Sequence, residues 1–245
     1  MDAIGLIPVR LQSKRLPGKA LLEIDGLPLI IHTAKRASLA KNISDVFVCT
    51  DNGKIINECK KHKIKYIKTF SNFQNGTERI ASVAKKFKKK IIVDIQGDEP
   101  LINPNHIDEI VKFHKKNIKK IEIVIPTIKT THNSPSSIIR VLSTKTGKIM
   151  YLSRSQIPHP YLENVSYIKK HLSIISFTSN SLMKYSKLKK SYYEKIEDIE
   201  LLRALENDMR VYSLDLKGSS FSVDIYDDYI KAQTAMYSDP IRKLY

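Results

Sequence analysis

Short apolar runs alternate with amphipathic segments through the first 130 residues, and this alternation limits the folds available to the chain. The apolar runs are Ile4–Val9, Asp45–Thr50, Ile91–Ile95 and Ile121–Thr127. Between them, apolar residues recur at helical spacing within residues 28–40, 54–62, 76–87 and 104–115. Strands that alternate with helices are typical of a parallel sheet covered by helices. We therefore expect an α/β protein with a Rossmann-like, doubly wound sheet.

The pattern changes after about residue 130. Residues 138–143 and 148–152 flank Thr146-Gly147 and predict a hairpin, and residues 171–178 predict a strand. Residues 194–206 predict one amphipathic helix, residues 210–216 a strand, and a last helix begins near Tyr226. We expect one mixed α/β domain over residues 1–245 with an inserted β-rich lobe.

The first apolar run leads directly into a basic loop. Arg10, Lys14, Arg15 and Lys19 fall within ten residues, together with Ser13 and the Pro17-Gly18 turn. Ligands of open α/β sheets bind beyond the carboxyl ends of the strands, where Arg and Lys form charge-assisted hydrogen bonds with phosphate. A solvated basic loop is the alternative. Four cations around one turn repel one another without an anion, which favours a phosphate site.

Carboxylates follow two later extended stretches. Asp98 follows the run Ile91–Ile95, and Asp224 follows a strand-like stretch at residues 220–223. Mg²⁺ is bound by one or two carboxylates together with substrate phosphates. The pair therefore forms a candidate Mg²⁺ site, with a turn residue or helix cap as the alternative for Asp98.

Other polar residues carry weaker signals. Arg79 follows a predicted capping box at Asn75–Glu78 and would reach an anion at that helix start. His171 opens a predicted strand, where a structural role is more common. Glu194, Glu197, Glu200 and Arg203 recur every three residues, and this spacing alone favours a solvated, self-paired helix face.

The composition narrows the list of partners. A net charge of +17 is compatible with three kinds of binding partner: nucleic acid, anionic membranes and polyanionic substrates. The lysines lie mainly near the ends of predicted helices, without the interleaved aromatic residues that base stacking needs. Two cysteines are too few for a disulfide framework or a zinc cluster, and no apolar run approaches the length of a membrane span. We expect a cytoplasmic protein that binds neither nucleic acid nor membranes.

Several common motifs are absent from the sequence. It contains no GxxxxGK[ST], GxGxxG, GxSxG, HExxH or CxxC. This excludes the Walker-type and dinucleotide-binding loops and offers nothing for serine-hydrolase, zinc-protease or dithiol chemistry.

One set of motifs, however, carries a family resemblance. The order Pro8, Arg10, Ser13, Arg15, Leu16, Pro17, Gly18, Lys19 resembles the opening signature of the sugar-acid cytidylyltransferases, and most closely that of the 3-deoxy-manno-octulosonate (Kdo) cytidylyltransferases. Further motifs of that family recur in order over nearly the whole chain: Gly76–Ile80, Gln96–Pro100, Tyr151–Arg154 with Ile157-Pro158, His171-Leu172, Glu194–Arg203 and Val223-Asp224.

The resemblance implies a reaction and a fold. CTP and a 3-deoxy-2-ulosonic sugar acid would give a CMP-sugar and pyrophosphate, within a nucleotide-diphospho-sugar transferase type of fold. It implies that residues 1–130 mainly bind nucleotide, that residues 131–215 form a sugar-binding and dimerisation lobe, and that residues 216–245 return to the core. A homodimer that serves lipopolysaccharide or capsule synthesis is also implied.

The resemblance assigns roles residue by residue. It implies nucleotide contacts for Arg10, Ser13, Arg15, Lys19, Arg79 and Gln96, and sugar contacts for Gln96, Arg154, His171 and Glu200. It implies Mg²⁺ ligands at Asp98 and Asp224, and a catalytic set of Arg10, Lys19, Asp98 and Asp224.

Two departures from the family pattern fall on the sugar side. The family's Leu-Gly-Ile-Tyr is Leu172-Ser173-Ile174-Ile175 here, and its Glu-Gln-Leu-Arg is Glu200-Leu201-Leu202-Arg203. Loss of two polar groups from a site that binds hydroxyls changes specificity. The same reaction on 8-amino-Kdo or on a nonulosonic acid is therefore an alternative to Kdo. A nucleic-acid-binding protein is the alternative from a different class.

Overall fold

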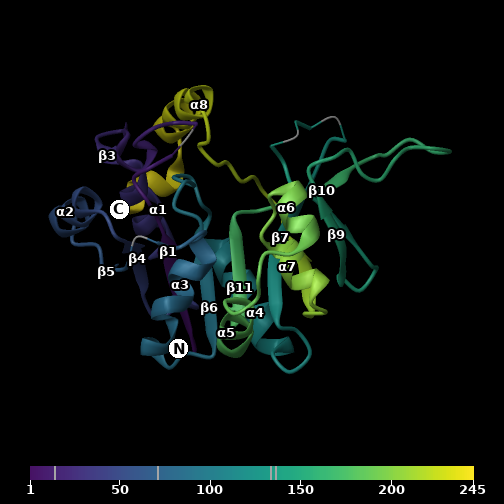
Figure 1. Cartoon of the computed structure of the whole chain (residues 1–245). Coiled ribbons are helices and arrows are strands. Elements are labelled where there is room, and N and C mark those ends of the chain that lie inside the picture. The colour runs from purple at the N-terminus through teal and green to yellow at the C-terminus, as the bar shows by residue number, and fades with distance from the viewer. Residues whose placement is uncertain (14, 71, 133, 136) are drawn as a thin grey trace.

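The computed structural model describes residues 1–13, 15–70, 72–132, 134–135 and 137–245 (Figure 1). Its centre is a 10-stranded sheet in the order β5-β4-β1-β6-β11-β7-β10-β8-β9, with β12 paired to β7. A separate two-stranded sheet contains β2 (Glu23–Ile24) and β3 (Leu27–Pro28). The mixed α/β architecture confirms the expected fold class.

Four parallel strands make up the first half of the large sheet. They are β1 (Ala3–Pro8), β4 (Val46–Thr50), β5 (Tyr66–Lys68) and β6 (Ile91–Ile95). β1 and β6 are buried along their whole length, which explains why their sequences are continuous apolar runs. The chain passes from β1 to β4 on one side and later returns to β6 on the other. The loops after β1 and β6 therefore meet at a topological switch point, the usual ligand position in open α/β sheets.

The second half of the sheet is mixed. β11 (Ile174–Thr178) lies antiparallel between β6 and β7 (Ile123–Thr130), and β12 (Val211–Asp215) pairs with β7 in parallel. Beyond β7 the antiparallel strands β10 (Ile168–His171), β8 (Arg140–Ser143) and β9 (Ile149–Ser153) extend the sheet. β8 and β9 form the expected hairpin. Figure 1 shows β9, β10 and their long connection on the opposite side of the molecule from α2.

Helices cover both faces of the sheet. One apolar cluster joins the sheet to α1 (Leu29–Ala37), α2 (Gly53–Lys61) and α4 (Pro104–Asn117). A second joins the opposite face to α3 (Gly76–Ala84), α5 (Ser179–Tyr185) and α7 (Leu201–Glu206). Ile7 belongs to the first cluster and Leu6 to the second, as alternation along β1 requires. α8 (Tyr226–Tyr237) packs on β2 and α1 through a smaller cluster.

Asparagine side chains begin three of these helices. Asn52, Asn75 and Asn103 accept hydrogen bonds from backbone amides at the starts of α2, α3 and α4. The expected cap at Asn75 is confirmed, with Glu78 N donating to Asn75 Oδ1 at 2.8 Å. The Glu78 carboxylate accepts from Gln74 N rather than from Asn75 N, so the return bond of the capping box lies one residue earlier.

Three predicted elements differ from the structure. The strand expected at residues 171–178 is interrupted, because His171 and Ser176 are five positions apart while their partners on β7, Thr127 and Val124, are only three apart. His171 therefore ends β10 instead of opening a strand. The helix expected at residues 194–206 is two helices, α6 (Tyr192–Glu197) and α7, separated by Asp198 in the left-handed conformation (φ 51°). Residues 220–223 are not a strand, but Val223 N donates to the carbonyl of Asp98.

Within the described residues, no helix combines the length and the apolar character needed to cross a membrane.

The contact between β1 and α3 gives a stability prediction. A Cβ on Gly76 would lie 2.9 Å from Cγ of Pro8, whose ring cannot move aside. Gly76→Ala is therefore expected to displace α3 and to lower the free energy of unfolding by about 1–3 kcal/mol. Gly53→Ala is the matched control, because nothing lies within 4 Å of its Cβ position at the start of α2. Urea denaturation of both variants checks this, and equal stabilities would contradict it.

Candidate active site

The loops after β1 and β6 approach each other closely. A Cβ on Gly97 would lie 3.3 Å from the carbonyl oxygen of Pro8, so a larger residue there would push the two loops apart. The third side of the site comes from the segment that leads into α8. Val223 N donates to the Asp98 carbonyl, which fixes that segment beside the loop after β6.

Lys19 and two carboxylates form the centre of the site. Lys19 Nζ lies 2.6 Å from Asp98 Oδ2 and 3.1 Å from Asp224 Oδ1, and it also donates to the Val223 carbonyl at 3.0 Å. The three side chains are between 18% and 24% exposed. Asp98 and Asp224, which are 79 and 205 positions from Lys19 in the sequence, thus meet at its ammonium group. The convergence of Asp98 and Asp224 that the sequence left open is present.

The basic loop surrounds this centre. Arg15 Nη2 lies 2.8 Å from Asp224 Oδ1, and 60% of the Arg15 side chain is exposed. Arg10 is exposed just after β1. Ser13 Oγ accepts from Leu16 N at 3.5 Å and so stabilises the turn. Lys14 lies outside the described residues. The loop therefore presents cations to solvent next to the carboxylates.

The donor set fits Mg²⁺. Asp98 Oδ2 and Asp224 Oδ1 both lie within 3.1 Å of Lys19 Nζ, so two carboxylates converge on one point that already holds a cation. Among the described residues no group of three or more His, Cys, Asp and Glu side chains forms a metal cluster. A site with two carboxylates suits a metal that completes its shell with phosphate oxygens and water, as Mg²⁺ does.

Arg79 and Gln96 lie deeper in the fold. Arg79 is buried, and its Nη1 contacts Thr69 Oγ1 at 2.5 Å, the Phe70 carbonyl at 3.1 Å and Asp51 Oδ1 at 2.9 Å. It fastens the loop before α3 to the end of β4, and its nucleotide contact stays a prediction. Gln96 Nε2 donates to Asp94 Oδ1 at 3.3 Å, and its backbone amide donates to the Ser173 carbonyl.

The candidate sugar-binding residues come from three separate elements. Glu200, at the start of α7, accepts a hydrogen bond from Thr77 Oγ1 at 2.8 Å, and burial raises its pKa to about 7. Burial lowers the pKa of His171 to about 4, so its imidazole is neutral at physiological pH. His171 Nε2 is buried and has no hydrogen-bond partner among the described residues. A buried polar atom without a partner is a group that a bound hydroxyl can satisfy.

Arg154 has a structural position. Its Nε donates to the Glu197 carbonyl at 2.9 Å, and its Nη2 donates to the Asp198 carbonyl at 3.3 Å. The guanidinium therefore satisfies free carbonyls at the end of α6, which explains why the helix stops there. Its contact with the sugar acid remains a prediction.

The spacing argument for a solvated acidic face is wrong for Glu194 and Arg203. Both are buried, and Arg203 forms two hydrogen bonds with Glu194, at 2.7 and 2.6 Å. The break at Asp198 changes the helical phase, which the three-residue spacing did not anticipate.

Sequence reasoning missed two residues of the site region. Asp94 lies within β6 and Thr77 in the first turn of α3, and both are fully buried. A carboxyl in the middle of the apolar run IIVDI was the available signal for Asp94, because a buried strand charge needs a partner.

Comparisons with known proteins agree with this geometry. A family model described as cytidylyltransferase matches residues 4–211. The 3-deoxy-manno-octulosonate cytidylyltransferase of Chloroherpeton thalassium is 31% identical over 96% of this chain and 98% of its own length. The enzyme of the same name from Nitratiruptor sp. is 33% identical over 95% of this chain and 99% of its own. A solved structure titled CMP:2-keto-3-deoxy-manno-octonic acid synthetase complexed with CTP superposes with a TM-score of 0.92 at 27% identity, covering 97% of this chain and 99% of that one.

The fold and the site thus define a cytidylyltransferase. Both relatives match over nearly their whole length, at 31% and 33% identity, and this indicates one family within the cytidylyltransferases. The chain belongs to the 3-deoxy-manno-octulosonate cytidylyltransferase family, and the resemblance of its motifs is confirmed.

Proposed function

We propose that this protein transfers CMP from CTP to the anomeric hydroxyl of Kdo, releases pyrophosphate and depends on Mg²⁺. The observation that carries this proposal is the convergence of Asp98 and Asp224 on Lys19 at the switch point of the sheet, beside an exposed basic loop. The family and the titles of its relatives support CTP and Kdo as substrates. They offer no support for 8-amino-Kdo, a nonulosonic acid or nucleic acid.

The basic loop acts on the triphosphate. Arg10, Arg15 and Lys19 neutralise phosphate oxygens, and the turn held by Ser13 sets their spacing. An in-line displacement of this kind is accelerated by positioning and by charge neutralisation on the departing pyrophosphate. Arg15 and Lys19 already lie beside the carboxylates, so little rearrangement is needed.

Asp98 and Asp224 would hold Mg²⁺. When bound, the ion polarises the α-phosphate and favours deprotonation of the attacking hydroxyl. Each carboxylate is fixed independently of the metal. Asp98 is held through the backbone contact with Val223, and the Asp224 amide donates to Asp228 Oδ2 at 3.1 Å.

The sugar acid is oriented by the opposite wall of the site. The neutral imidazole of His171 has a buried nitrogen, without a partner in the part of the chain that the structure describes, for a sugar hydroxyl. Glu200 offers a carboxylate oxygen, and Gln96 an amide that Asp94 already orients. These groups hold the acceptor so that its anomeric hydroxyl faces the α-phosphate.

The test is pyrophosphate release with CTP, Mg²⁺ and a panel of Kdo, 8-amino-Kdo and nonulosonic acids. Rapid release with Kdo is expected, with little release when CTP is replaced by ATP or when Mg²⁺ is removed by EDTA. Release only with another acid would contradict the proposed substrate. A folded protein that neither releases pyrophosphate nor binds CTP would contradict the transferase function.

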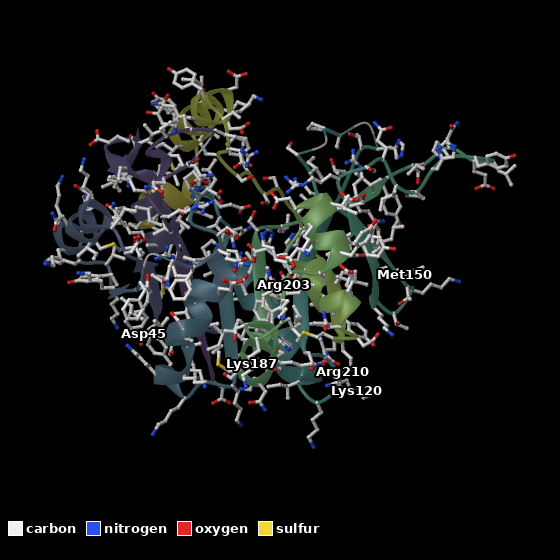
Figure 2. All side chains as sticks on the ribbon, viewed as in Figure 1. Asp45, Lys120, Met150, Lys187, Arg203 and Arg210 are labelled. Atoms are coloured by element: carbon white, nitrogen blue, oxygen red, sulfur yellow. The ribbon has the colours of Figure 1, made fainter. Side chains whose placement is uncertain are left out.

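We also propose that the protein acts in the cytoplasm, where CTP is available, as a homodimer in lipopolysaccharide synthesis. Support for the dimer comes from large apolar side chains exposed on β9, α6 and the arm between β9 and β10: Met150, Tyr161, Leu162, Tyr192, Tyr193 and Ile196. Figure 2 shows Met150 on the β9 side of the molecule, at the end of the large sheet. Exposed apolar groups gathered in one region are typical of protein interfaces.

The dimer gives its own prediction. Ile196 is 64% exposed on α6, and Ile196→Asp is expected to weaken the dimer at least about tenfold, since it introduces a charge into an apolar contact. Sedimentation equilibrium measures the change. Tyr237→Asp is the matched control, because Tyr237 is 93% exposed at the end of α8, away from this surface. A wild-type monomer, or equal effects of the two substitutions, would contradict the proposed interface.

A further inference from the structure

Two buried carboxyl groups flank one hydroxyl beneath the sugar side of the site. Thr77 Oγ1 lies 3.1 Å from Asp94 Oδ2 and 2.8 Å from Glu200 Oε2. On the far side of Asp94, Oδ1 accepts the Gln96 amide at 3.3 Å. The four side chains therefore form one connected series, from Gln96 through Asp94 and Thr77 to Glu200.

The number of hydrogens in this series is informative. A threonine hydroxyl has one hydrogen to donate, so it can satisfy only one of two ionised carboxylates. With both ionised, the second would face the hydroxyl oxygen with no hydrogen between them. If one carboxyl keeps its proton, that proton fills the gap, and every contact in the series becomes a hydrogen bond.

Asp94 is the better holder of the proton. It is fully buried on β6, whereas Glu200 is nearer the surface and lies close to Arg203. In this arrangement Asp94 Oδ2 donates to Thr77, and Thr77 donates to an ionised Glu200. Burial and the charge on Glu200 both raise the pKa of Asp94 well above its usual range, in agreement with the geometry.

The charged groups around the pair do not offer a second positive charge. Arg203 is already engaged by Glu194 and by Glu78, and both of these acids also face Glu200. On the Asp94 side the neighbour is the buried Cys49 thiol, and Arg79, which lies beyond Cys49, pairs with Asp51. Tyr185 donates its hydroxyl to the Glu200 backbone carbonyl, not to its carboxylate.

The departures from the family pattern lie next to the same pair. Ile175 is the cross-strand partner of Asp94 on β11, and Leu201 directly follows Glu200. Both are buried in the apolar cluster on this face of the sheet. Neither side chain can donate a hydrogen bond to a second ionised carboxylate, so this chain in particular favours a single shared negative charge.

We propose that Asp94 is a positioning residue, which keeps its proton and, through Thr77 and Gln96, fixes the Glu200 carboxylate and the Gln96 amide against the sugar acid. This inference rests on the proposed function for the role of those two groups. The shared proton itself does not depend on it. Asp94 does not touch substrate in this account and acts only through its two neighbours.

The proton is tested by infrared spectroscopy of the full-length protein at neutral pH. Wild type is expected to show the carbonyl band of a protonated carboxylic acid, shifted in heavy water, and Asp94→Asn is expected to lack it. Subtraction of the two spectra is needed, because burial also raises the pKa of Glu99 and raises that of Glu200 to about 7. Identical spectra would overturn the shared proton, whether or not the protein transfers CMP.

The positioning role is tested by steady-state kinetics of the same variants. Asp94→Ala removes the contact that orients the Thr77 hydroxyl towards Glu200 and the acceptor of the Gln96 amide, so kcat/KM for the sugar acid is expected to fall roughly tenfold or more, with KM for CTP unchanged. Asp94→Asn keeps a donor towards Thr77 and an acceptor for Gln96, and is expected to restore most of the loss. Thr77→Val is expected to behave like Asp94→Ala, and Thr77→Ser like wild type.

The outcomes separate the inference from the proposed function. An active wild type with equal losses in Asp94→Asn and Asp94→Ala, or with KM for CTP rising as much as KM for the sugar acid, would overturn the positioning role. A folded wild type that is inactive with CTP and Kdo would overturn the proposed function. The infrared band would still show whether Asp94 keeps its proton.

Discussion

Asp98→Asn is expected to abolish CMP transfer while the protein stays folded. Asp98 Oδ2 accepts from Lys19 Nζ at 2.6 Å, and an asparagine oxygen can still do so, but a neutral amide no longer attracts a dication. We expect kcat to fall about a thousandfold or more, the scale on which loss of charge stabilisation at a reacting centre acts. The Asp98 side chain is 24% exposed, so loss of this ion pair changes the free energy of unfolding by about 1 kcal/mol or less.

The matched control for this variant is Asp227→Asn. Asp227 is exposed in the first turn of α8, three residues beyond Asp224. Its substitution by asparagine removes the same charge as Asp98→Asn but leaves the site unchanged. It is expected to keep wild-type turnover. Binding of Mn²⁺ in the presence of CTP, followed by electron paramagnetic resonance, gives a readout besides activity. Retained turnover or retained Mn²⁺ binding in Asp98→Asn would remove Asp98 from the metal role.

Arg203→Ala is expected to cause the largest loss of stability. Arg203 is 1% exposed and forms two hydrogen bonds with Glu194, which is 4% exposed, and Figure 2 labels Arg203 near the middle of the view. Removal of the guanidinium leaves a buried carboxylate without its partner. The expected cost is about 3–5 kcal/mol in the free energy of unfolding, measured by urea denaturation.

Arg210→Ala is the control for the loss of an arginine ion pair. Arg210 is labelled near the edge of the fold in Figure 2, and its pair with Glu122 is about half exposed on the arginine side. An exposed pair contributes about 0–1 kcal/mol, so this variant should remain close to wild type. The double variant Arg203→Met with Glu194→Leu should recover part of the loss, because it removes both charges. Similar stabilities for the two arginine variants would contradict the buried role of Arg203.

The first part of the fold, from β1 to β6, could be predicted from the sequence because its signals are local. The strands β1, β4 and β6 are continuous apolar runs, and an asparagine cap marks the start of each of α2, α3 and α4. Once these strands are placed in parallel, the loops that carry Lys19 and Asp98 must open on the same edge of the sheet. Only the approach of Asp224 to Lys19 could not be predicted in this way and is seen in the tertiary structure alone.

The environment of the proposed sugar-binding residues could not be predicted in the same way, because these side chains are fixed by contacts distant in sequence. Arg154, just after β9, donates to the last carbonyl of α6, and Thr77 on α3 joins Asp94 on β6 to Glu200 at the start of α7. No periodicity in the sequence encodes such contacts. The interruption between β10 and β11 depends likewise on the register against β7, which a single strand does not reveal.

The central claim is that the site around Lys19, Asp98 and Asp224 joins CMP to Kdo. Phosphorus-31 NMR of the wild-type protein with CTP, Kdo and Mg²⁺ tests it most directly, since it follows the α-phosphorus itself. We expect the α-phosphate signal of CTP to be replaced by a phosphodiester signal, with pyrophosphate appearing in equal amount. CTP that remains unchanged, or that yields free CMP without the phosphodiester, would contradict the account.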